Sequence, residues 1–146
     1  MSEANRTISV EVERRIAAPP DRVFDAWLDP QALGRWLFAT PDGRMERVEV
    51  DPRVGGRFLI AERRDGELAE HFGEYLEIDR PRRLVFTFAA DREEAPSLVT
   101  VTIEADGDGS RIRLVHEMDA QWADYEARTR QGWASILEAL ERSLGS

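Results

Sequence analysis

The stretch from Asp119 to Ser146 constrains the fold most, because its pattern predicts one long amphipathic helix. A helix from Trp122 to Leu144 would be roughly 35 Å long, enough to cross a whole sheet. Residues within about 100° of arc would form one buried stripe: Trp122, Glu126, Thr129, Trp133, Ile136, Leu137, Leu140 and Leu144. The second half of the stripe is apolar and predicts a core anchor. The first half mixes aromatic and polar residues and predicts the wall of a pocket.

Seven segments have the alternation or the composition of β-strands. They are Ile8–Ile16, Met45–Val50, Arg57–Glu62, Ala69–Ile78, Leu84–Phe88, Leu98–Glu104 and Arg111–Met118. The last six are joined by connections so short that only an antiparallel meander can form. Side-chain parity is inconsistent within Ala69–Ile78, which suggests a β-bulge in that strand.

Two short helices are expected between the first two strands. Apolar residues recur at helical spacing after Pro20, are interrupted at Pro30, and resume at Leu33. A flat sheet would bury little against one helix, so we expect the sheet to curl around the C-terminal helix. The predicted fold class is α+β, in a single domain over residues 1–146.

Glycines at two places have structural interpretations. The Gly55-Gly56 pair has neither phosphate-loop nor dinucleotide spacing, so it predicts a tight turn that needs positive φ angles. Gly132 lies in the middle of the predicted helix, where glycine costs about 1 kcal/mol relative to alanine. We therefore expect the backbone at Gly132 to press closely against a ring or a strand.

The composition excludes several classes of function. The net charge of -9 argues against sequence-independent binding to nucleic acid and against stable association with anionic membranes. All 20 basic residues are arginine, which excludes a lysine Schiff base, and the lack of cysteine excludes a thiolate nucleophile. The first residues have no apolar signal region, so a cytoplasmic location is expected.

Four segments resemble one known family, in the same order along the chain. They are RRIAAPPDRVFDAWLDPQALGRW at Arg14–Trp36, VEVDPRVGGRF at Val48–Phe58, FGEYLEIDRPRRLVFTF at Phe72–Phe88 and QGWASILEAL at Gln131–Leu140. With these segments the chain resembles the SRPBCC, or START-like helix-grip, superfamily. Within it, the chain is similar to bacterial proteins related to the C-terminal domain of the heat-shock-protein-90 ATPase activator. The resemblance implies a curved seven-stranded sheet gripping the long helix around a cavity, which holds an apolar small molecule in many relatives. It carries over no catalytic residue.

The two histidines differ in their predicted positions. His71 and His116 lie on different strands, and no His-x-x-x-His pair or cysteine completes a metal site, so neither metal nor cofactor is expected. His116 has inward parity just before the long helix, which would place it beneath Trp122, Tyr125 or Glu126. It is either a hydrogen-bonded structural histidine or a polar group that orients a ligand or acts as a general base.

Several other residues are candidates for the cavity wall. Glu126 is interpreted either as an exposed partner of Arg130 at i,i+4 or as an inward carboxylate. Four aromatic residues are expected near the gap between the short helices, the sheet and the long helix. The full predicted lining is Trp36, Phe58, Phe88, His116, Trp122, Glu126, Thr129 and Trp133.

Three functions remain open from the sequence. The first is a non-catalytic module, monomeric or homodimeric, that encloses a small apolar or amphipathic molecule. The second is an enzyme of cyclase or hydratase type, with His116 or Glu126 moving a proton in the same cavity. The third is a domain that contacts a chaperone. A non-catalytic role is favoured over an enzyme.

Overall fold

The computed structural model describes residues 7–29, 33, 44–64, 66–89, 97–119 and 124–144. One antiparallel sheet has the strand order β1-β7-β6-β5-β4-β3-β2. The strands are β1 (Thr7–Ile16), β2 (Arg44–Val50), β3 (Arg57–Arg64), β4 (Glu67–Asp79), β5 (Arg83–Phe88), β6 (Ser97–Asp106) and β7 (Gly109–Asp119). The described helices are α1 (Pro20–Asp25) and α3 (Glu126–Leu144). All seven predicted strands and the α+β fold class are confirmed.

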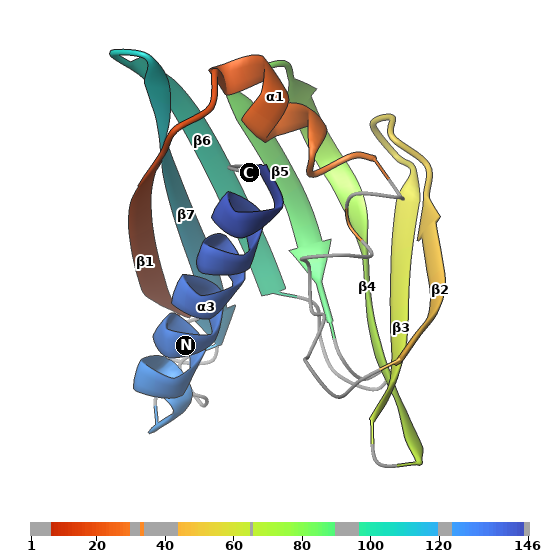
Figure 1. Ribbon diagram of the computed structural model, residues 1–146. Coiled ribbons are helices and arrows are strands. Elements are labelled where there is room, and N and C mark those ends of the chain that lie inside the picture. The colour runs from red at the N-terminus through yellow and green to blue at the C-terminus, as the bar shows by residue number, and fades with distance from the viewer. Residues whose placement is uncertain are drawn as a thin grey trace.

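The curved sheet has two halves that face the interior from different sides. Helix α3 lies along the half that contains β1, β7 and β6, while β2, β3 and part of β4 bend round to form the opposite wall (Figure 1). Helix α1 crosses one end of the sheet and contacts β6 and β7. The second predicted short helix lies outside the described residues, apart from Leu33. Neither described helix is long and apolar enough to cross a membrane.

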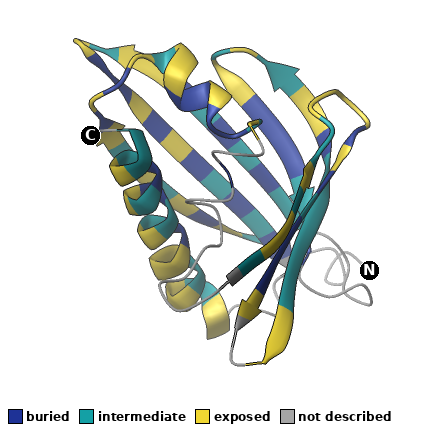
Figure 2. Cartoon of the chain, turned by 45° about the vertical axis from the view of Figure 1, so that its right-hand side comes forward, coloured by how far each residue is buried: buried dark blue, intermediate teal, exposed yellow. Residues whose placement is uncertain are grey.

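Helix α3 is anchored by its second half, as predicted. Trp133, Leu137 and Leu140 are buried, and this burial stabilises the fold by about 2 kcal/mol for each large apolar side chain. Their side chains face the sheet, while the opposite side of the helix is exposed (Figure 2). Glu126 and Thr129, in the first half, are half-buried. The helix proper begins at Glu126, later than predicted from Trp122, which lies outside the described residues.

Two polar contacts join the C-terminal end of α3 to β1 and to α1. Arg14 on β1 forms an ion pair with Glu141 at 2.7 Å. The guanidinium of Arg22 on α1 donates to the carbonyl of Leu144 at 3.1 Å. Because these contacts join segments more than 120 residues apart, they hold the helix against both the edge strand and the short helix.

The predicted bulge in β4 is confirmed. The pairing of β4 with β5 shifts by one residue between Tyr75 and Glu77, so Leu76 is the extra residue. A bulge of this kind restores the side-chain parity that an uninterrupted strand would lose. As a result, Tyr75 and Ile78 both face the interior, and Leu76 is 45% exposed.

Three glycines show different reasons for lacking a side chain or, in one case, no reason that the surroundings supply. Gly55 has a φ of 87°, as expected for the predicted turn. A Cβ added to Gly73 would lie 1.8 Å from the Thr87 carbonyl oxygen and 2.7 Å from the ring of Phe58. The expectation for Gly132 was wrong, because this residue is exposed and a Cβ there would meet nothing within 4 Å.

We predict that Gly132→Ala raises the free energy of unfolding by about 0.5 to 1 kcal/mol, because alanine favours helix and meets no obstruction here. Gly73→Ala is the matched control and should lower the same quantity by roughly 1 to 3 kcal/mol through overpacking. Urea denaturation followed by circular dichroism measures both. A Gly132→Ala protein less stable than the wild type would contradict the exposed position of this residue.

Candidate functional site

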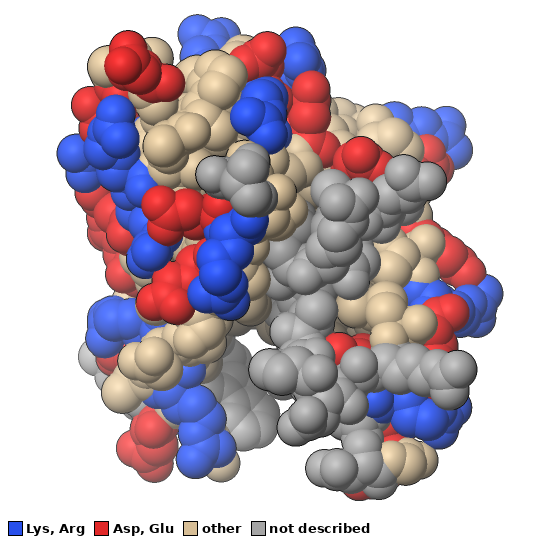
Figure 3. Space-filling view, in the orientation of Figure 1, with Lys and Arg blue, Asp and Glu red and all other residues tan. Residues whose placement is uncertain are grey.

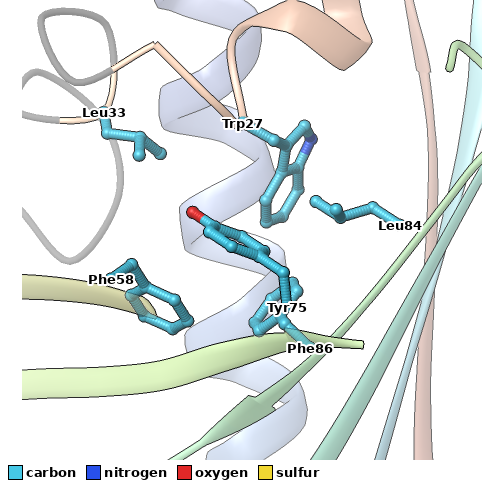
Figure 4. A pocket seen from close by; sticks show the side chains of 6 residues that line it. All are labelled: Trp27, Leu33, Phe58, Tyr75, Leu84 and Phe86. Atoms are coloured by element: carbon cyan, nitrogen blue, oxygen red, sulfur yellow. The ribbon is translucent and has the colours of Figure 1, made fainter. Parts of the chain in front are cut away.

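The described residues form an apolar pocket at the end of the interior nearest α1. Its cavity volume is about 10 Å³, roughly the space of one water molecule, and the pocket is open to solvent. The walls come from the residues after α1, from β3, from β4 beside its bulge, and from β5 (Figure 4). The lining residues are Trp27, Leu33, Phe58, Tyr75, Leu84 and Phe86.

Aromatic side chains give the pocket its shape. Phe58 is the central ring, with centroids 5.6 Å from Tyr75 and 5.5 Å from Phe86. Trp27 closes the other side, 6.1 Å from Phe86. The Phe58 ring occupies the space left by the missing side chain of Gly73, its direct partner on β4. The pocket wall therefore depends on a glycine in one strand opposite an aromatic residue in the next.

Tyr75 adds a polar atom to this apolar surface. Its side chain crosses the pocket and its hydroxyl points toward Leu33 (Figure 4). Burial, and to a smaller extent the charge of Asp51, raises the pKa of Tyr75 well above its ordinary value of 10.0. The hydroxyl is therefore neutral at physiological pH and acts as a hydrogen-bond donor or acceptor, not as an anion.

A second group of residues joins α3 to the sheet farther along the interior. The indole nitrogen of Trp133 donates to Nδ1 of His116 at 2.9 Å, and Nε2 of His116 lies 2.6 Å from the hydroxyl of Ser97. Ser97 donates in turn to the carbonyl of Phe88 at 3.1 Å. The rings of Phe88 and His116 meet edge to face at 5.6 Å. This arrangement is a continuous hydrogen-bonded chain from the helix to β5.

The direction of this chain determines the protonation of His116. Because the indole can only donate, Nδ1 of His116 must accept, and the neutral ring carries its proton on Nε2. Nε2 then donates a hydrogen bond to the hydroxyl oxygen of Ser97. The Ser97 hydroxyl in turn donates to the Phe88 carbonyl. Burial lowers the pKa of His116 from 6.5 to about 4. His116 therefore has no free lone pair for proton abstraction in this arrangement and does not activate Ser97 as a nucleophile.

The structure brings some of the predicted site residues together. Phe88, His116 and Trp133 form one cluster, with Phe88 and Trp133 ring centroids 5.9 Å apart. Of the predicted residues that the structure describes, Phe58 alone lines the apolar pocket. The residue of α3 that contacts His116 is Trp133, which lies about two helical turns beyond the expected neighbour Glu126.

The other predicted lining residues are less central. Glu126 forms an ion pair with Arg130 at 3.1 Å, which corresponds to the first of its two interpretations. Thr129 is half-buried on α3. Trp36 and Trp122 lie outside the described residues.

Sequence reasoning missed most residues of the apolar pocket. Leu84 and Phe86 share the inward parity of Phe88, and this signal was available in the sequence. Tyr75 required the position of the bulge, and Ser97 required the register between β5 and β6. Trp27 and Leu33 required the angle at which α1 crosses the sheet (Figure 1).

The charged surface and the possible metal ligands do not indicate a second site among the described residues. Arginine and acidic side chains are interspersed over the face that carries α3, without a large area of one sign (Figure 3). Three such pairs are Arg14–Glu141, Arg130–Glu126 and Arg142–Glu138. Among the described residues, no group of three His, Cys, Asp or Glu side chains is placed to hold a metal ion.

A family model described as "Activator of Hsp90 ATPase homolog 1-like protein" matches residues 17–145. No protein with a curated description matches significantly. Among solved structures, protein CV1439 from Chromobacterium violaceum is 26% identical, with a TM-score of 0.83 over 94% of this chain and 97% of that one. The AHSA1-like protein from Aeromonas hydrophila is 23% identical, with a TM-score of 0.81 over 94% of this chain and 92% of that one. The second likeness, at this identity, concerns the fold alone.

We predict that acid weakens the fold through His116. The unfolded chain binds a proton on this residue below about pH 6.5, whereas the folded state resists protonation down to about pH 4. Stability should therefore fall by roughly 2 kcal/mol between pH 6.5 and pH 5 and level off below pH 4. Urea denaturation at each pH measures the effect.

The matched reference for this experiment is His116→Gln, which cannot titrate but leaves every carboxylate in place. The predicted quantity is the difference in pH dependence between the two proteins, because contributions from acidic residues cancel. Parallel stability curves for wild type and His116→Gln would contradict the buried neutral histidine.

Proposed function

Because this chain belongs to the family of Activator of Hsp90 ATPase homolog 1-like proteins, whose fold is of a ligand-binding type, we propose that it binds a small apolar or amphipathic molecule. The proposed site is the pocket between the sheet and the residues after α1; none of its described lining residues comes from α3, beside which the cavity was expected. The observation that carries the proposal is the aromatic pocket beside α1, whose wall is formed by Phe58, Tyr75 and Phe86. The protein is proposed to act in the cytoplasm.

Burial of apolar surface would supply the affinity. The pocket presents rings and branched side chains, and transfer of apolar surface out of water is favourable by roughly 25 cal/mol per Å². The cavity volume of about 10 Å³ lies far below the 300–1,000 Å³ typical of sites for drug-sized ligands. A ligand can therefore enter only if the lining side chains move apart, and we propose a ligand no larger than one ring or a short branched chain in this part of the interior.

The charge of the lining limits the chemistry of the ligand. The six described lining residues include no ionisable group other than Tyr75, which is neutral because burial raises its pKa. A charged group in this pocket would lose its hydration without gaining an ion pair. The part of the ligand bound here is therefore uncharged.

A cyclase or hydratase reaction is the second candidate. In such a reaction His116 or Glu126 would move the proton, but both ring nitrogens of His116 lie in the chain from Trp133 to Ser97, and Glu126 pairs with Arg130. These contacts favour binding over proton transfer by either residue. A chaperone contact is motivated only by the wording of the family description, and sedimentation with a purified chaperone of the Hsp90 type would test it.

The binding proposal predicts that ethylbenzene raises the melting temperature of the protein, because a ligand that binds only the folded state stabilises it. Leu33→Phe should reduce or remove this shift by filling the pocket. Differential scanning calorimetry with saturating ligand measures the effect. Mass spectrometry after denaturing extraction of the purified protein identifies any ligand retained from the cell.

Leu76→Phe is the matched control for this substitution. It adds the same ring at an exposed position of the bulge, outside the pocket, and should leave the ligand-induced shift unchanged. The proposal fails if a panel of small aromatic and branched aliphatic compounds gives no shift in the wild type and extraction releases nothing.

A further inference from the structure

The two edges of the sheet are β1 and β2, and no strand of the described chain pairs with their outer sides (Figure 1). An edge strand presents backbone N–H and C=O groups that can pair with a strand of another molecule. The β2–β3 register shifts between Met45 and Arg47, which makes Glu46 a bulged residue. At the other end, Pro52 has no N–H group to donate. The regular part of the β2 edge is therefore Arg47–Val50.

Side chains along this segment alternate between the two faces of the sheet. Val48 pairs with Ile60, which is buried in the core, so Val48 lies on the inner face and is half-buried. Arg47 and Glu49 lie on the outer face, with 60% and 54% of their side chains exposed, and form an ion pair along the strand. An ion pair this exposed stabilises little, so either side chain can turn to a charge on a neighbouring molecule.

We propose that β2 pairs with β2 of a second copy of this chain, antiparallel and about a two-fold axis at Val48. In this register Arg47 lies directly opposite Glu49 of the second copy, twice by symmetry, and the two Val48 side chains meet. Opposite charges at directly opposed positions stabilise a ladder, as do pairs of β-branched side chains. This inference is independent of the proposed ligand binding.

The charge pattern selects this register over its neighbours. In a symmetric antiparallel pair, the residue on the axis faces itself. An axis at Arg47 would oppose two guanidinium groups, and an axis at Glu49 would oppose two carboxylates. Like charges directly opposite each other destabilise a ladder. An axis at Val48 opposes no like charges, and registers farther along meet the bulge or Pro52.

The other edge strand lacks this complementarity. On β1 the exposed residues on either side of Val12 are both acidic, Glu11 and Glu13. A second copy paired about Val12 would therefore place Glu11 opposite Glu13 of the other molecule. The arginine partners of these carboxylates, Arg113 and Arg111, belong to β7 of the same chain. Symmetric pairing about the central valine is thus favoured at β2 and opposed at β1.

The shortness of the edge limits the assembly to a weak, closed dimer. The segment Arg47–Val50 buries far less than the roughly 1,600 Å² of a standard interface, so association should need a high protein concentration. A two-fold pair uses the β2 edge of both molecules and leaves none for a third copy. The net charge of -9 on each chain opposes association. At about 0.15 M salt, where the Debye length is about 8 Å, distant charges are screened more than the facing pairs.

The test is sedimentation equilibrium over a concentration series at about 0.15 M salt, which measures the dissociation constant of the dimer. The wild type should show a monomer–dimer equilibrium. Arg47→Glu should raise the dissociation constant about tenfold or more, because both facing pairs become repulsive. Adding Glu49→Arg to this variant restores opposite charges in the same register. The double variant should therefore return to within about threefold of the wild type.

Arg83→Glu is the matched control. It changes the net charge by the same amount on an exposed side chain of β5, a strand in the middle of the sheet, and should leave the dissociation constant unchanged. In ¹H–¹⁵N spectra of the wild type, the amide resonances of Arg47–Val50 should shift with protein concentration, whereas those of β1 should not. Circular dichroism checks that each variant is folded.

Several outcomes would overturn the proposal. A wild type that stays monomeric up to about 1 mM overturns it, even if lysate shifts the β2 resonances, since the edge would then serve another protein. A dimer that Arg47→Glu leaves intact, or one whose concentration-dependent shifts lie on β1, overturns the β2 interface. A double variant as weak as Arg47→Glu alone overturns the register about Val48. The ethylbenzene experiment is unaffected by any of these results.

Discussion

The interior depends on one constraint, that β4 keeps its apolar side chains on the inner face of the sheet along its whole length. The extra residue at Leu76 lets Tyr75 and Ile78 face the same side although they are three positions apart. Without it, one half of the strand would present polar side chains to the core, because a shift of one residue reverses every side chain. The bulge thus lets Tyr75 form the wall of the apolar pocket while Ile78 packs against the core.

The hydrogen-bonded chain from Trp133 to Phe88 gives the interior its second organising feature. It joins α3 to β7, β6 and β5 through three hydrogen bonds. Because the indole of Trp133 can only donate, the donor and the acceptor of each bond are fixed. A buried polar chain of this kind is stabilising only when every member is satisfied. His116 is therefore part of the scaffold that holds α3 on the sheet.

Much of the fold could be predicted from the sequence, and less of the site. Alternation in β1 and β7 and the apolar stripe around Leu137 and Leu140 depend on local periodicity, which a single sequence displays directly. The predicted site residues Phe88, His116 and Trp133 do lie together, since their parity was readable. Their mutual contacts could not be predicted, because the residue that contacts His116 depends on the position of α3 along the sheet. Gly132 illustrates the same limit, since its exposure follows from the rotation of the helix.

The sequence alone was sufficient for the order of elements, the curled sheet and the exclusion of lysine or cysteine chemistry, because these follow from residue type and short-range period. Only the folded structure shows that Phe58 fills the space at Gly73 and that both ring nitrogens of His116 lie in a hydrogen-bonded chain. These facts depend on strand register and on helix position, which result from packing between residues distant in the chain and leave no local pattern in the sequence.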